Sequence, residues 1–291
     1  SGNPNNYYHS SPKTQEDSYC EMGRFVRGFS FNGLVFSLPP KVAEAMDETQ
    51  KSSLVATKEA LIDSGDFKKT FYKEKTSVII GNAIGGENRV ESIWRIFFPE
   101  IARALKQTPQ FQKLQTSEQT TFLENLQKIY QSQYMEITED SMPGELSNII
   151  SGRIANVFNL CGSNYTTDAA CASSLAALQS TIYGLKAHDF DMAITGGSDH
   201  SMSPDTYIQF CKIGALSGEK SCPFDIEANG FVMGEGCAIF VLKRLEDAER
   251  DNDKIYAVIR AIGSSSDGKG KGITAPNVKG QILAIKRAYE S

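Results

Sequence analysis

The residue best placed to do chemistry is Cys171, in the segment TTDAACASSLAALQSTIYGLKAH. A short strand pattern ends near Asp168, small residues make a sharp turn, and a helix pattern begins at Cys171. A helix N-terminus carries unpaired N–H groups and positive partial charge, which favour the nucleophilic thiolate form of a cysteine placed there. The same N–H groups could hold the oxyanion of an attacked thioester. The pattern therefore favours a nucleophile elbow that accepts an acyl group.

The neighbours of Cys171 decide whether a substrate could reach its sulfur. Five of them are small and leave room: Ala169, Ala170, Ala172, Ser173 and Ser174. The apolar residues that follow at helical spacing give the helix a buried face: Leu175, Leu178, Ile182 and Leu185. A buried cysteine beside alanine at a helix start is also ordinary core packing, and the spacing alone leaves both interpretations open.

Two of the three histidines bear on whether Cys171 has a base. His188 follows Cys171 along the predicted helix, which would separate the two by roughly 25 Å, so it cannot be the base. His200 follows the strand pattern Met192 to Gly196, and the carboxyl ends of neighbouring parallel strands meet at one edge of a sheet. His200 could therefore come near Cys171, which keeps a Cys-His thioester hydrolase open as an alternative. Otherwise His200 is a loop residue.

Strand and helix patterns alternate along the chain. The run TSVIIGNAIGG, residues 76–86, predicts a buried strand that leads into a tight glycine turn. Further strands are predicted over residues 164–168, 192–196, 237–242 and 255–262. Helices are predicted over residues 39–64, 144–162 and 171–187, with a charged helix between the last two strands. This alternation predicts an α/β layered fold around a mainly parallel sheet.

Two segments fall outside this alternation. Residues 1–25 are polar and turn-rich, and they indicate an arm with no core of its own. Residues 90–135 hold two helical patterns around a Gln- and Thr-rich segment, and they predict an inserted helical layer. The aromatic residues of its first helix, Trp94, Phe97 and Phe98, fit a core or a subunit interface better than a ligand site, because an amphipathic helix needs that spacing.

Composition excludes several classes of protein. The 291 residues are 40% hydrophobic, enough for a packed core, and the net charge is −5. Lysine and arginine are scattered, so no basic stripe could bind nucleic acid. No stretch approaches the roughly 18 consecutive apolar residues of a membrane helix, and the polar N-terminus has no signal pattern. We expect no membrane span and a cytoplasmic protein.

The six cysteines are too sparse for a disulfide scaffold, and none stand in a CxxC pair, so we expect free thiols. Neither cysteine nor histidine spacing matches a zinc site, and we expect no metal and no bound cofactor. The glycines of GFVMGEG lack GxGxxG spacing and a following helix, which argues against a nucleotide site. Asp225 and Glu235 are too far apart in sequence to be called a catalytic pair, and we interpret both as structural.

The motif DAACASS, residues 168–174, resembles the active-site motif of the β-ketoacyl synthases of polyketide and polyunsaturated fatty acid synthases, which are thiolase-fold condensing enzymes. Nearly every residue from about Tyr7 onward can be placed on this family. TAPN and the helical insertion favour the iterative, multidomain type. Further segments fall in the family's order: PPKVAEAMDETQ, GELSNIISGRIANVFNLCG, GGSDHSMSPDTYIQFCKIGALS, CPFDIEANGFVMGEGCAIFVLKRLEDA and GSSSDGKGKGITAPN.

The resemblance implies a thiolase-like layered α-β-α fold with a mainly parallel sheet. It divides the chain into an N-terminal arm over residues 1–38, an N-terminal thiolase-like half over 39–250 and the start of a C-terminal half over 251–291. The helical insertion occupies about residues 90–140 of the first half. Family members are homodimers, so the resemblance also implies a homodimer.

In this family the cysteine is acylated from the thioester of an acyl carrier protein or coenzyme A. A malonyl carrier is then decarboxylated, and the resulting carbanion attacks the acyl enzyme to give a β-ketoacyl thioester. Carried onto this sequence, Cys171 is the nucleophile and its own N–H is one oxyanion-hole donor. The implied partners are an acyl carrier protein, whose phosphopantetheine arm presents the acyl group, and other domains of a multidomain synthase.

The sequence departs from the family in one respect that concerns catalysis. The family's decarboxylation uses two histidines in motifs resembling EAHGTGT and NIGH, and neither motif occurs here. The family's opening strand, of the type IAIVGM, also has no counterpart before residue 25. We therefore expect a fragment of a larger synthase and no complete condensation by these residues alone. A non-catalytic partner of the chain-length-factor kind is the remaining alternative, although that class characteristically lacks the cysteine.

Overall fold

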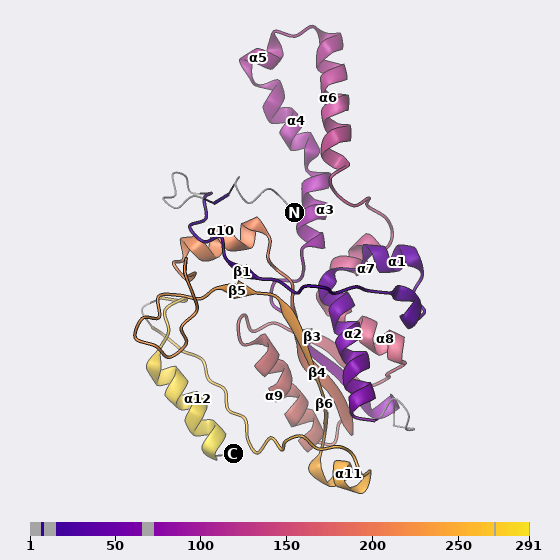
Figure 1. Ribbon diagram of the computed structural model, residues 1–291, viewed down its shortest axis with the longest axis vertical. Coiled ribbons are helices and arrows are strands. Elements are labelled where there is room, and N and C mark those ends of the chain that lie inside the picture. The colour runs from indigo at the N-terminus through magenta and orange to yellow at the C-terminus, as the bar shows by residue number, and fades with distance from the viewer. Residues whose placement is uncertain (1–6, 9–15, 66–72, 271, 291) are drawn as a thin grey trace.

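The computed structural model describes residues 7–8, 16–65, 73–270 and 272–290 (Figure 1). Its strands are β1 (Gly23–Arg24), β2 (Thr76–Gly81), β3 (Asn164–Thr167), β4 (Met192–Asp199), β5 (Met233–Gly234) and β6 (Gly236–Lys243). Its longer helices are α2 (Glu48–Asp63), α3 (Asn88–Ile96), α4 (Phe98–Lys106), α6 (Thr116–Gln131), α8 (Asn148–Phe158), α9 (Ser173–Lys186), α10 (Pro204–Lys212) and α12 (Val278–Glu290). Its short helices are α1 (Pro40–Ala45), α5 (Pro109–Gln112), α7 (Ser141–Glu145) and α11 (Leu245–Arg250), with 3-10 helices η2 (Gly33–Phe36) and η4 (Lys73–Lys75).

A four-stranded sheet forms the centre of the molecule, with strand order β3-β2-β4-β6. β2 runs parallel to β3 and β4, and β6 closes the edge antiparallel to β4. All six residues of β2 are buried, as expected for a strand covered on both faces. The mainly parallel sheet predicted from the alternating pattern is confirmed.

Helices cover both faces of this sheet, and the alternation of side chains along β2 shows how. Val78 and Ile80 point into a core formed with α2 and α8, where Leu54 and Ile154 are fully buried. Ile79 points to the opposite face and packs with residues of α9. The strand period of two therefore separates an α2/α8 layer from an α9 layer, which gives the predicted α-β-α arrangement.

The helix predicted over residues 39–64 is broken at Asp47 into α1 and α2. Asp47 has an extended backbone and caps α2, with its Oδ1 accepting hydrogen bonds from the backbone N (2.9 Å) and Oγ1 (2.7 Å) of Thr49. Its Oδ2 accepts from the backbone N of Asn88 at 3.0 Å, just where α3 begins. The helix is interrupted at Asp47, although the apolar spacing is continuous, because the buried Asp47 carboxylate accepts hydrogen bonds from donors of two helices at once.

Replacing Asp47 with alanine should destabilise the protein by about 2 kcal/mol, since a helix cap and a buried charge-assisted hydrogen bond are both lost. Urea denaturation followed by circular dichroism measures the effect. Glu48→Ala removes the same charge one residue along, from a half-exposed side chain, and should cost less than about 0.5 kcal/mol. Equal midpoints for the two variants would contradict the capping role.

The inserted helices α3 to α6 project from the body as a separate helical extension instead of covering the sheet as a layer (Figure 1). The aromatic residues of this extension pack against one another: the ring centroids of Trp94 and Tyr134 lie 6.0 Å apart, and those of Phe98 and Tyr130 lie 5.7 Å apart. Phe98 is buried as predicted, whereas Phe97 is exposed. The predicted helices therefore form, but their arrangement differs from the predicted layer.

The strand predicted over residues 255–262 is wrong. The segment has no regular secondary structure, and Tyr256 is 74% exposed. A strand needs a neighbour that supplies N–H and C=O groups, and no strand within the described ranges pairs with this segment. The β-branched composition of the segment favours a strand, but without a neighbouring strand to bond with, the segment stays irregular.

The N-terminal segment packs against the rest of the molecule, as predicted for a segment that has no core of its own. β1 pairs in parallel with β5, and Cys20 is buried in a small cluster with Cys211, Leu216 and Met233. Much of the predicted arm, including His9, lies outside the described residues.

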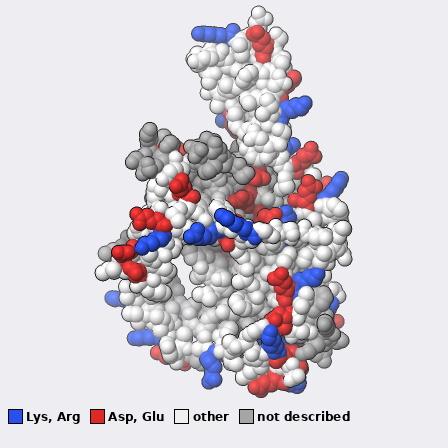
Figure 2. Space-filling view, viewed as in Figure 1, with Lys and Arg blue, Asp and Glu red and all other residues white. Residues whose placement is uncertain are grey.

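Charges of both signs are interspersed on the face seen in Figure 2, with no continuous basic stripe there. Of the helices in the described part of the chain, none has the length and apolar content needed to cross a membrane.

Candidate active site

The turn that carries Cys171 joins β3 to α9 and is held by side chains at both of its ends. Asp168 Oδ1 accepts a hydrogen bond from the backbone N of Ala170 at 2.9 Å. Ser173 Oγ accepts from the backbone N of Ala169 at 2.9 Å and donates to the carbonyl of Ala170 at 2.6 Å. These bonds hold Ala170 in the left-handed region, at φ 50°, immediately before the cysteine. A non-glycine residue there marks a strained, tightly specified turn.

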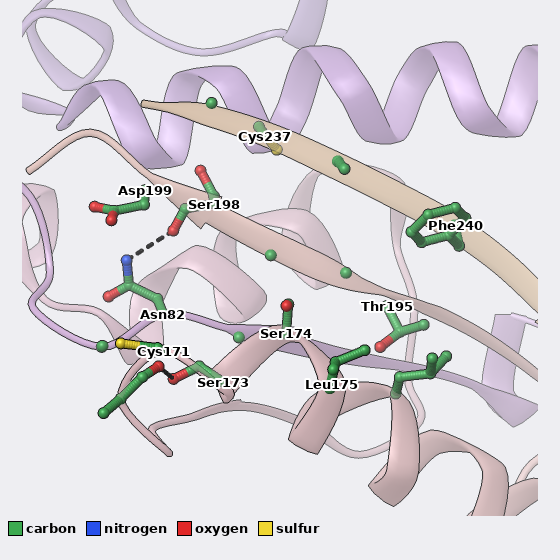
Figure 3. Close-up of a pocket in the computed structure, with 18 residues that line it drawn as sticks. Asn82, Cys171, Ser173, Ser174, Leu175, Thr195, Ser198, Asp199, Cys237 and Phe240 are labelled. Atoms are coloured by element: carbon green, nitrogen blue, oxygen red, sulfur yellow. Dashed lines mark hydrogen bonds between the residues drawn. The ribbon is translucent and has the colours of Figure 1, made fainter. Parts of the chain in front are cut away.

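Cys171 lies at the tip of this turn, two residues before the first helical residue of α9, so the helix begins later than predicted. Its side chain is exposed and lines a cleft of about 520 Å³ (Figure 3). The cleft lies between α9 and the sheet. Ser174 of α9, Asn82 just after β2, Ser198 of β4, and Cys237 and Phe240 of β6 are among the residues that line it. The small neighbours Ala170, Ser173 and Ser174 leave the sulfur accessible, as predicted from their types.

Two glycines allow the start of α9 to lie directly on the sheet. A Cβ on Gly81, the last residue of β2, would come within 2.4 Å of the backbone of Ser173 and Ser174. A Cβ on Gly197 of β4 would come within 2.8 Å of the Ser174 side chain. The elbow therefore has its position because these two strand residues have no side chain.

Asn82 ties together the ends of β2 and β4 beside the cleft. Its Nδ2 donates to the carbonyl of Ser198 at 2.8 Å (Figure 3), and its Oδ1 accepts from the backbone N of Gly85 at 2.9 Å. Asn82 is only 4% exposed, so these bonds form away from water. Asn82 is not among the site residues predicted from the sequence, although an asparagine between a strand and a glycine turn is a recognisable signal.

His200 does not join Cys171 in the cleft, and it is not among the residues that line it. Its Nε2 lies 3.0 Å from Ser52 Oγ on α2, on the face of the sheet opposite α9, and its Nδ1 lies 3.6 Å from Glu235 Oε2. Both ring nitrogens thus have partners away from Cys171. His188 follows α9 at the end of the helix far from Cys171, as predicted.

All six cysteines are free. Within the described ranges, no group of three or more His, Cys, Asp and Glu side chains is arranged to hold a metal ion.

The free thiols should differ in their reactivity toward iodoacetamide. Burial raises the pKa of Cys20 and of Cys237, so both hold less thiolate at neutral pH than a free cysteine. Cys171 and Cys161 are exposed. Peptide mass spectrometry after brief alkylation at neutral pH should find Cys171 and Cys161 modified first, with Cys20 and Cys237 catching up as the pH rises. Modification of Cys237 as fast as Cys161 at neutral pH would contradict this order.

The profile of the family described as "Beta-ketoacyl synthase, N-terminal domain" matches residues 2–248 of the chain. Among curated proteins, the chain is 36% identical to a polyunsaturated fatty acid synthase polypeptide of Thraustochytrium sp., over 97% of this chain and 10% of that protein. It is 31% identical to a phenolphthiocerol/phthiocerol polyketide synthase polypeptide of Mycobacterium tuberculosis, over 98% of this chain and 16% of that protein. The chain thus spans between a tenth and a sixth of the length of these relatives.

Solved structures agree with this match. The ketosynthase from module 6 of the bacillaene synthase of Bacillus subtilis 168 is 30% identical, with a TM-score of 0.66 over 89% of this chain and 38% of that one. A ketosynthase domain of the oxazolomycin synthase of a Streptomyces albus strain, OzmH KS7, is 24% identical, with a TM-score of 0.75 over 99% of this chain and 44% of that one. The second likeness shows the fold.

Proposed function

This chain belongs to the β-ketoacyl synthase family, and from that membership we propose that it accepts an acyl group from a carrier thioester on the sulfur of Cys171. The observation that carries the proposal is the exposed Cys171 side chain at the tip of a turn that opens into a cleft. The thiolase-like α/β fold indicated by the sequence resemblance is confirmed by the solved ketosynthases.

In the proposed step the Cys171 thiolate attacks the carbonyl carbon of the acyl thioester. A carbon–sulfur bond to Cys171 forms, the bond to the phosphopantetheine sulfur breaks, and the carrier thiolate leaves and takes a proton from water. The backbone N–H of Cys171, next to the first turn of α9, would donate to the oxyanion of the tetrahedral intermediate. The acyl enzyme is the form that a malonyl-derived carbanion would attack in the family's condensation.

The condensation half of the reaction needs groups that stabilise the negative charge formed during decarboxylation and that transfer protons. The described histidines do not supply them, because His188 lies at the far end of α9 and His200 bonds to Ser52 on the opposite face of the sheet. We therefore assign acyl transfer to Cys171 and the decarboxylation to groups outside the described residues.

The proposed partners follow from this chemistry: an acyl carrier protein with its phosphopantetheine arm, further domains of a multidomain synthase, and a second copy of the chain in a homodimer. The relatives are components of large synthases, which supports the multidomain setting. Six free cysteines support a reducing compartment, and we place the protein in the cytoplasm.

The test is the number of carrier thiols released per chain from an acyl-carrier thioester. The reaction is stopped by rapid quench, the protein is removed because its own cysteines would react, and the released thiol is measured with a thiol reagent. Acyl transfer predicts one carrier thiol released per chain and then a plateau, because the acyl group stays on Cys171. Continuous release would instead indicate the thioester hydrolase. No release would contradict the proposal and favour the non-catalytic partner of the chain-length-factor kind.

A further inference from the structure

A chain of polar side chains runs from Glu235, the partly buried residue between β5 and β6, to the cleft of Cys171. It begins at Glu235 Oε2, which lies 3.6 Å from His200 Nδ1, and continues from His200 Nε2 to Ser52 Oγ at 3.0 Å. Ser52 Oγ lies 3.3 Å from the Oγ of Ser198, a residue of β4. His200 and Ser52 are 7% and 8% exposed, and Ser198 is 3% exposed. Hydrogen bonds in such a place are exchanged with water only at a cost.

Ser198 connects the two faces of the sheet. Its side chain points to α2, where the Oγ donates to the carbonyl of Thr49 at 3.2 Å in addition to its contact with Ser52. Its carbonyl accepts from Asn82 Nδ2 on the cleft side (Figure 3). The position of Ser198 relative to α2 therefore sets the position of the carbonyl that holds Asn82 at the edge of the cleft.

The segment that follows His200 is anchored to the turn after β2. Ser201 Oγ donates to the carbonyl of Gly85 at 3.1 Å, and the backbone N of Met202 donates to Glu87 Oε1 at 2.9 Å. Gly85 also bonds through its N–H to Asn82. The loop after β4 and the turn after β2 thus form one hydrogen-bonded unit, and His200 adds a bond from this unit to Ser52 of α2 beside the bond that Ser198 makes to Thr49.

We propose that His200 is a positioning residue for acyl transfer at Cys171: through Ser52 and Ser198 it fixes Asn82 and the edge of the cleft. The proposal rests on the proposed function for its effect on catalysis, and on the hydrogen-bond chain alone for its effect on structure. His200 itself contacts neither Cys171 nor the cleft, so its role differs from that of the base considered for the hydrolase.

Two readouts test the proposal. The first is hydrogen exchange at the Gly85 amide, which reports on its bond to Asn82 without any substrate. The second is the rate constant for acylation of Cys171 by a saturating acyl-carrier thioester, measured by quenched intact mass. His200→Phe removes both ring nitrogens and keeps an aromatic ring, Ser52→Ala removes the next link, and His200→Gln keeps an amide that can reach Ser52.

His200→Phe and Ser52→Ala should each slow acylation about tenfold and speed exchange at Gly85 by a similar factor, while half-saturation by the thioester stays unchanged. His200→Gln should remain within about threefold of wild type. Ser53→Ala is the matched control. Ser53 is a fully buried serine on the same helix, and its Oγ donates to the carbonyl of Thr49 at 2.6 Å and lies 3.8 Å from Cys237 Sγ. It should lose comparable stability and keep wild-type values for both readouts.

Equal Gly85 exchange in Ser52→Ala and Ser53→Ala would overturn the proposal, and so would wild-type acylation by His200→Phe. If His200→Phe does not fold, Ser52→Ala against Ser53→Ala decides. If the wild-type chain takes no acyl group, the proposed function fails while the exchange readout still decides whether His200 positions Asn82.

Discussion

Cys171→Ala should abolish the release of carrier thiol, lowering single-turnover acyl transfer by at least about a thousandfold. The reason is chemical, since the sulfur is the atom that forms the new bond and alanine offers no nucleophile. The side chain is exposed, so removing it leaves no cavity in the core and the fold should be retained. Rapid-quench measurement of released thiol, with circular dichroism as a check on folding, gives the result directly.

Cys161→Ala is the matched control for this variant. Cys161 is also an exposed free thiol, but it lies outside the cleft, in the turn before β3. It should release carrier thiol at the wild-type rate. Residual transfer by Cys171→Ala together with a loss in Cys161→Ala would show that the acyl group is accepted at a different sulfur.

Gly81→Ala should be strongly damaging although it adds a single methyl group beside the site. The added Cβ would lie 2.4 Å from the backbone of Ser173 and Ser174, and that backbone can move only by displacing the start of α9. We expect a loss of about 3 kcal/mol in the free energy of unfolding. We also expect acylation to slow by about a hundredfold, because the thiol moves relative to the groups that bind the thioester. Urea denaturation and quenched acylation measure the two effects.

Gly152→Ala separates this steric effect from the general effect of replacing a glycine. Gly152 is in α8, and a Cβ there would meet only Asn164 Oδ1, at 3.6 Å. Alanine is the better helix former, so this variant should be at least as stable as wild type and acylate normally. A Gly81→Ala protein with wild-type stability and acylation would show that the elbow does not depend on close packing against β2.

The elbow could be predicted from sequence because its signals are local. Strand, small residues, cysteine and helix follow one another within some twenty residues, and each has a recognisable composition. The bonds that fix the turn could also have been found, since Asp168 and Ser173 lie two and four residues from the amide groups that they accept from. The pattern predicts the start of α9 two residues too early, because helical periodicity does not show where the capped end of a helix begins.

The surroundings of His200 could not be predicted in the same way. Its place after a parallel strand was correct, and so was the edge of the sheet at which it lies. Which face its ring would meet depends on packing with Ser52, which is 148 residues away in sequence. Periodicity carries no information on such pairs. The same limit explains the failed strand over residues 255–262, whose composition suits a ladder although no partner strand lies beside it in the described part of the chain.

The central claim is that the acyl group is carried by the sulfur of Cys171. The most direct measurement is the intact mass of the protein after incubation with an acyl-carrier thioester, followed by digestion and sequencing of the modified peptide. The account predicts one acyl adduct per chain, on the peptide that contains Cys171 and labile to hydroxylamine as a thioester should be. An adduct on any other cysteine, or no adduct on a folded protein whose Cys171 still reacts with iodoacetamide, would contradict it.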